Sequence, residues 1–361
     1  MSASQWLEVF VSFGVQVSLV VGLACWIERY AVSVRTRSSV WTTAFVSILV
    51  LFGMSMLLPR LHLFKPWSII RPNAMLSIAE TQIVVGRVLL SVWCIGAVVV
   101  VLNWMRRGWM LQRFMKRCEV LPADEESRLR RLVDINDDTK ILVGQDLDGP
   151  FCWQLHEPTI VLPRFLLHGS DEDIRHVLTH ELEHLATAHP LQLFLQHAVE
   201  VLCWFHPFIW KASKRASLVR EFACDDAAIA KGADTAAYLR TLLKIAERCE
   251  AKNVSLGFGR NRSEIVIRSQ RLVKRATATD TSRFVFGRRP AIALTFFATF
   301  LISQIWLPMD VMASPNASWS PWPTWSARSL HSFGVHARDY EPYHQRVLLY
   351  DLREDAQEAS R

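Results

Sequence analysis

Four long apolar stretches without a charged residue constrain this chain more than any other feature of its sequence. They cover residues 9–27, 40–59, 88–105 and 290–309. A helix of about 20 residues crosses the roughly 30 Å hydrocarbon core of a bilayer, and the buried helices of soluble proteins seldom run that far without a charge. The first eight residues also lack the Lys and Arg that open a cleaved signal peptide. We therefore predict four membrane helices.

The basic residues that flank these stretches predict the orientation of the chain. Lys and Arg are absent before the first stretch and gather after the first, after the third and before the fourth. Because cytoplasmic flanks carry the excess of positive charge, the N-terminus is predicted outside and residues 106–289 inside. The basic residues Arg60, Lys65, Arg71 and Arg87 would lie outside in this orientation, against the rule, but the other flanks together carry more Lys and Arg. Topology then explains most of the net charge of +7, which leaves no support for direct nucleic-acid binding.

The cysteines favour neither disulfides nor a cysteine-rich metal site. The chain has seven of them, an odd number, and none stands in a C-x-x-C pair. Disulfide frameworks use even numbers at regular spacings, and zinc sites built from cysteine use closely spaced pairs. A reducing compartment suits this pattern best.

The segment predicted to lie inside contains the pattern H-E-x-x-H. Ser170 suits the N-cap of a helix, acidic residues follow it in the first turn, and apolar residues recur at helical spacing until Pro190. On such a helix His180 and His184 share one face, where two imidazoles can bind one Zn²⁺. Glu181 then lies beside the open position of the metal and can take a proton from a bound water. The pattern predicts a catalytic zinc site with Glu181 as the base.

A catalytic zinc needs a third protein ligand, which must come from elsewhere in the chain. His189 lies five residues after His184, and that spacing turns it away from the ligand face of a continuing helix. Further on, Glu221 and Asp225 are one turn apart on a helix predicted to close at Gly232. Glu221 could bind the metal while Asp225 accepts a ring N–H from one of its histidines. A solvated acidic helix face explains the same spacing equally well.

With these residues the chain resembles the BlaR/MecR-type membrane metallopeptidases, sensor-transducers whose best-known members respond to beta-lactam antibiotics. Residues 157–163 (EPTIVLP) are similar to the strand-like element before the zinc helix of that family. Residues 204–210 (WFHPFIW) are similar to its Trp-Phe-x-Pro element, and residues 221–225 (EFACD) to its glutamate motif. These elements occur in the family's order over about residues 150–232.

The resemblance implies a gluzincin-type peptidase in the bacterial cytoplasmic membrane. It implies one Zn²⁺ per chain, bound by His180, His184 and Glu221. Asp225 would support these ligands from outside the metal's own coordination sphere. The large extracellular penicillin-binding domain of the antibiotic-sensing members has a reactive Ser-x-x-Lys, whereas no lysine follows residue 309 here. Acylation by a beta-lactam through that chemistry is therefore not expected.

The predicted fold is a mainly α membrane protein with a cytoplasmic α+β gluzincin-type domain. Residues 1–105 would form a membrane region with three helices, and residues 106–289 the metallopeptidase domain. Residues 290–309 would form the fourth membrane helix and residues 310–361 a short extracytoplasmic tail.

Three functions are compatible with this layout. The first is a signal-transducing zinc endopeptidase that hydrolyses cytosolic protein substrates, a transcriptional repressor being one candidate, with the membrane lipid as its other partner. The second is a membrane receptor or scaffold with a non-catalytic zinc site; Glu181 argues against it, because a structural zinc closes its fourth position with a ligand and needs no base. The third is a quality-control protease of membrane proteins. Neither the substrate, the signal nor the oligomeric state is indicated by the sequence.

Overall fold

The computed structural model is mainly helical, with one small sheet. It describes residues 3–57, 72–145, 147, 149–155, 157–253, 260–277 and 286–307.

Three of the described helices are long and apolar enough to cross a membrane. These spans are Trp6–Arg29 in α1 (Ala3–Arg29), Val34–Ser55 in α2 (Val34–Leu57) and Ser77–Met115 in α3 (Pro72–Met115). Helix α3 has 44 residues and runs through the basic flank that was predicted to follow residue 105. The predicted domain boundary at 105 therefore lies inside one continuous helix.

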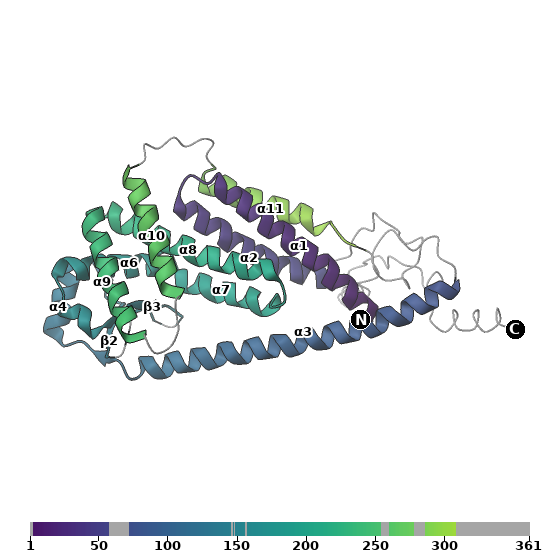
Figure 1. The fold of residues 1–361 in the computed structure, drawn as a ribbon, viewed down its shortest axis with the longest axis horizontal. Coiled ribbons are helices and arrows are strands. Elements are labelled where there is room, and N and C mark those ends of the chain that lie inside the picture. Colours follow the sequence, from purple (N-terminus) through teal and green to yellow (C-terminus); the bar gives the residue numbers. More distant parts are fainter. Residues whose placement is uncertain are drawn as a thin grey trace, which may run out of the picture.

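Only part of the fourth predicted membrane helix is helical in the described residues. Helix α11 (Arg288–Ser303) begins where residues 290–309 were expected to begin, but its 16 residues are fewer than a full crossing requires. The chain leaves the helix after Ser303, and the end of the predicted stretch lies outside the described residues. A fourth crossing stays a prediction, as does the layout of residues 310–361. Figure 1 shows α11 beside α1 and α2 in one bundle.

A four-stranded sheet supports the helix that carries the H-E-x-x-H pattern. Its strands are β1 (Glu119–Val120), β2 (Lys140–Gly144), β3 (Phe151–Trp153) and β4 (Thr159–Pro163), in the order β1-β2-β4-β3. Strands β2 and β4 are parallel, and the other pairs are antiparallel. All five residues of β4 are buried, as its unbroken apolar run requires.

The sheet and the H-E-x-x-H helix share one apolar core. Ile174 and Leu178 of helix α6 (Asp171–Ala186) belong to the same buried cluster as Ile160 and Leu162 of β4. The side chain of Ser170 accepts a hydrogen bond from the Asp173 N–H, which confirms the predicted N-cap. The short helices α4 (Ala123–Leu132) and α5 (Arg164–Leu167) border the same core.

Four helices complete the described fold. Helices α7 (His189–Leu202) and α8 (Pro207–Ala230) form a hairpin beside α1 and α2, and α9 (Thr235–Asn253) and α10 (Arg260–Thr277) pack against the far half of α8 (Figure 1). The predicted closure of α8 is confirmed, because Gly232 follows its end with a φ of +100°, a conformation that glycine adopts readily.

A buried carboxylate joins the membrane helices to α8. Glu28 in α1 accepts hydrogen bonds from the indole N–H of Trp41 in α2, at 3.1 Å, and from Arg215 in α8, at 2.6 and 2.9 Å. Arg35, in the first turn of α2, forms an ion pair with Glu183 of α6 at 2.5 Å. The two helices with candidate metal ligands are thus each tied to one end of a membrane helix.

We expect Glu28→Ala to lower the apparent melting temperature of the detergent-purified protein. The change leaves the Trp41 N–H without its acceptor and Arg215 without its counter-ion, a loss of about 2 kcal/mol. Arg128→Ala is the matched control, since it removes an exposed ion pair with Asp171 that contributes below about 1 kcal/mol. Equal melting temperatures for the two variants would contradict the structural role of Glu28.

Candidate metal centre

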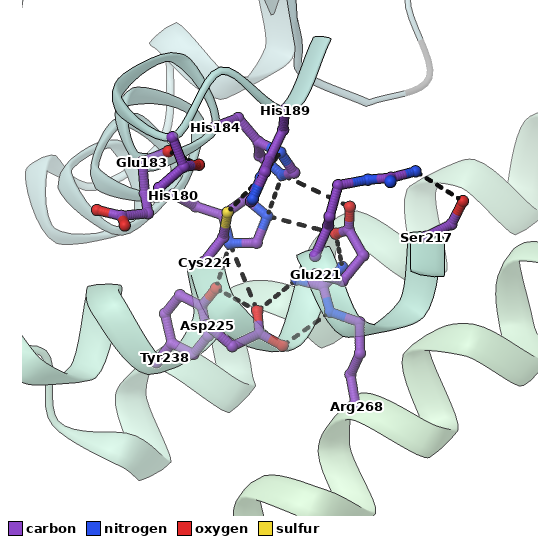
Figure 2. A network of polar contacts seen from close by, with 12 residues as sticks. His180, Glu183, His184, His189, Ser217, Glu221, Cys224, Asp225, Tyr238 and Arg268 are labelled. Carbon is purple, nitrogen blue, oxygen red and sulfur yellow. Dashed lines mark hydrogen bonds and ion pairs between the residues drawn. The ribbon is translucent and has the colours of Figure 1, made fainter. Parts of the chain in front are cut away.

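Two helices bring three potential metal ligands together. His180 and His184 lie one turn apart on α6, and Glu221 faces them from α8 (Figure 2). The two histidine Nε2 atoms are 3.2 Å apart, Glu221 Oε2 is 3.4 Å from His180 Nε2, and Glu221 Oε1 is 3.5 Å from His184 Nε2. Atoms that bind zinc tetrahedrally at 2.0–2.1 Å lie roughly 3.4 Å apart. The three donors therefore have the spacing that one tetrahedral metal ion requires.

A fourth donor, Cys224, lies beside this set. Its Sγ lies within 4.8 Å of ligand atoms of His180 and His184. Burial and the nearby carboxylates raise the pKa of the thiol, which disfavours the thiolate form that binds zinc. Burial alone would raise the pKa of Glu221 as well, but Arg268 and the histidines hold it well below its usual value. Glu221 is thus ionised and better suited to a cation than Cys224.

Asp225 reaches His180 mainly through a tyrosine. His180 Nδ1 is 2.9 Å from the Tyr238 hydroxyl of α9, which donates a 2.8 Å hydrogen bond to Asp225 Oδ1. The separation between His180 Nδ1 and Asp225 Oδ1 is 3.4 Å. The sequence predicted a direct contact between histidine and carboxylate, and the hydroxyl bridge performs the same task. It fixes a proton on Nδ1 and leaves the Nε2 lone pair for a metal.

His189 contacts His184, contrary to the expectation that it turns away. Helix α6 ends at Ala186, and Ala188 adopts a left-handed conformation with φ 53°, so the helical spacing no longer applies at His189. The chain reverses there and places His189 Nδ1 2.9 Å from His184 Nδ1. Burial lowers the pKa of His189 to about 3, so its ring is neutral and can accept the N–H of His184.

Arg268 of α10 neutralises the acidic side of the centre. Its guanidinium lies 2.9 Å from Glu221 Oε2 and donates to Asp225 at 2.5 and 3.0 Å. Asp225 is fully buried, and a buried carboxylate without a partner would be strongly unfavourable. Neither Arg268 nor Tyr238 was identified from the sequence, because each lies on a separate helix and has no motif spacing to the ligands.

Glu181 lies beside the ligands on a cavity of about 490 Å³. Burial raises the pKa of its carboxyl to about 7. Strand β3, the outermost strand on its side of the sheet, forms one wall of the cavity, and apolar side chains such as Leu193 and Ile245 form much of the rest. The cavity therefore combines a titratable carboxyl, a metal-ligand set and a strand edge.

Comparison with known proteins agrees with these features. A family model described as BlaR1 peptidase M56 matches residues 6–272, which include most of α1, all of α2 and α3, and every residue of the candidate centre. The chain belongs to the BlaR1 peptidase M56 family. A curated relative, the Regulatory protein BlaR1 of Bacillus licheniformis, is 24% identical over 143 residues, or 38% of this chain. The match spans about a quarter (24%) of that relative's length. A membrane-associated, metallopeptidase-like chain is thus established, and the resemblance is confirmed.

We expect Tyr238→Phe to weaken zinc binding about tenfold or more, because His180 loses the hydroxyl that fixes its Nδ1 proton. Competition with a chromophoric chelator on the purified protein measures this affinity. Thr241→Val is the matched control on α9, since that hydroxyl contacts Nδ1 of His176, which lies outside the ligand set, at 3.0 Å. Wild-type affinity in both variants would show that the bridge does not tune the centre.

Proposed function

We propose that this chain is a membrane-bound, signal-transducing zinc endopeptidase that hydrolyses protein substrates. One observation carries the proposal: the nitrogen and oxygen atoms of His180, His184 and Glu221 stand at tetrahedral spacing beside the buried Glu181. A purely structural site would have no use for a base beside its ligands. Membership of a peptidase family supports the same conclusion.

A zinc ion held by these residues would lower the pKa of a water toward about 7 and polarise a peptide carbonyl. Glu181 then acts as general base, taking the proton of the attacking water, and as general acid toward the leaving amine. Its pKa of about 7 suits both directions of transfer. Tyr238 and His189 contact the Nδ1 atoms of the two ligand imidazoles, so both rings can present Nε2 to the metal. The edge of β3 offers backbone groups to an extended peptide.

The proposed side of the membrane is the cytoplasm. Basic residues cluster at the end of α3 and before α11, next to the ends of the apolar stretches. We therefore propose that residues 106–289 lie inside, the N-terminus outside and, after a fourth crossing, residues 310–361 outside. Because the relative is named a regulatory protein, we favour regulated cleavage of a cytosolic protein, with a transcriptional repressor as a candidate, over general degradation.

We expect Glu181→Gln to reduce cleavage of a generic unfolded substrate by at least 10²-fold while zinc content stays unchanged. The amide keeps the shape of the side chain but cannot take a proton. Glu172→Gln, an exposed position in the first turn of the same helix, serves as the control. Substrate loss and bound zinc are measured together for all three proteins. Wild-type cleavage by Glu181→Gln would exclude Glu181 as the base, and zinc without cleavage in any protein would favour a receptor.

A further inference from the structure

The tip of the α7–α8 hairpin lies against the middle of the first membrane helix. His206 Nε2 is 3.2 Å from both the Gly14 carbonyl and the Ser18 hydroxyl, and the ring of Phe205 meets that of Phe10 edge-on at 6.0 Å. These contacts come from residues more than 180 positions later in the chain, in the segment expected to be cytoplasmic.

The tip also contacts the third membrane helix. The Trp93 indole of α3 donates to the Leu202 carbonyl at 2.9 Å, and the Trp204 indole donates to the Trp93 carbonyl at 3.2 Å. A side chain on Gly96 would overlap the Trp204 ring. The tip is therefore held between two helices that are each long and apolar enough to span a bilayer.

The position of these contacts fixes the depth of the tip. The apolar span of α1 runs from Trp6 to Arg29, and the hydrocarbon core holds about 20 of its residues. Any window of about that length, from residues 6–25 to residues 10–29, contains both Gly14 and Ser18. If α1 crosses the bilayer, the residues that touch Gly14 and Ser18 lie in the hydrocarbon region.

The hairpin is too short to cross and instead turns back. Helix α7 has 14 residues, about 21 Å at 1.5 Å per residue, against a core of about 30 Å. Helix α8 then returns to the inner end of α1, where Arg215 pairs with Glu28. Between Pro190 and Trp210 the only charged residue is Glu200, and its carboxylate is bound by Gln196 and His197.

The hairpin has an apolar face that stays partly exposed, although some of its rings also touch protein, as Phe205 touches Phe10. Its large side chains are 41–57% exposed in the described part of the chain: Leu191, Phe194, Phe205, Phe208 and Trp210. The backbone of α7 and α8 is helical, and the short turn between them also makes backbone hydrogen bonds. The hairpin therefore bonds its own backbone polar groups internally, as a segment surrounded by lipid must. Contact of these apolar side chains with water would be less favourable than contact with lipid acyl chains.

We propose that α7 and the first turn of α8, up to Trp210, form a re-entrant membrane hairpin whose exposed apolar face contacts lipid acyl chains. Glu221 lies on the same continuous α8, beyond Arg215, so the metal centre is anchored directly at the inner membrane surface. The inference rests on α1 crossing the bilayer and not on peptidase activity, so it can fail or hold independently of the proposed reaction.

Site-directed spin labelling in lipid vesicles tests this. A single cysteine replaces Phe208 in one variant and Trp210 in another. In the full-length background the native cysteines are removed, and only the buried Cys203 and Cys224 are kept. Ala230→Cys, at the exposed end of α8, is the aqueous control, and Ile95→Cys, 65% exposed in the span of α3, is the lipid reference. Zinc binding by each labelled protein verifies its fold.

We expect the ratio of oxygen to nickel-chelate accessibility to be the same for nitroxides at positions 208, 210 and 95. This ratio should be several-fold higher than the ratio for the nitroxide at position 230. A label at Leu191 should give an intermediate ratio, because it lies near the entry of α7. Nickel-chelate accessibility at 208 equal to that at 230 would overturn the proposal. So would shielding from both reagents combined with spin–spin broadening, since a second copy of the chain would then cover this face.

Discussion

The metal centre depends on one buried cluster of charges, in which the Arg268 guanidinium lies between the carboxylates of Glu221 and Asp225. Two carboxylates one turn apart on a buried helix face repel each other and resist desolvation. Arg268 offsets both effects, and the cluster holds Glu221 ionised and close to His180 and His184. Helix α10 is therefore part of the centre, even though it contributes no metal ligand.

The same two helices that carry the ligand set are fastened to the membrane bundle. Helix α6 is held through Glu183 and Arg35, and α8 through Arg215 and Glu28, both near the same ends of α1 and α2. One apolar core continues from α1 and α2 into α7 and α8. Helices α6 and α8 meet at the ligands, so the two ion pairs connect α1 and α2 to the helices that carry His184 and Glu221. This arrangement is physically suited to coupling a membrane signal to the centre.

Local patterns in the sequence predicted what local geometry determines. The Ser170 cap, the shared face of His180 and His184, and the closure at Gly232 depend on neighbouring residues, and the structure has each of them. His189 was wrongly placed because one left-handed residue, Ala188, ends the helical spacing. Tyr238 and Arg268 depend on the packing of separate helices, which no spacing encodes. The contacts of residues 204–206 with α1 and α3 were missed for the same reason, since a motif does not tell where its helix docks.

X-ray absorption at the zinc K-edge of the purified protein identifies the atoms that bind the metal. Binding of one zinc ion by His180, His184 and Glu221 predicts a first shell of nitrogen and oxygen scatterers alone, at about 2.0–2.2 Å, two of them imidazoles. It also predicts that Glu221→Ala loses an oxygen scatterer, whereas Cys224→Ala leaves the spectrum unchanged. A sulfur scatterer at about 2.3 Å that disappears in Cys224→Ala would instead assign the third ligand to Cys224.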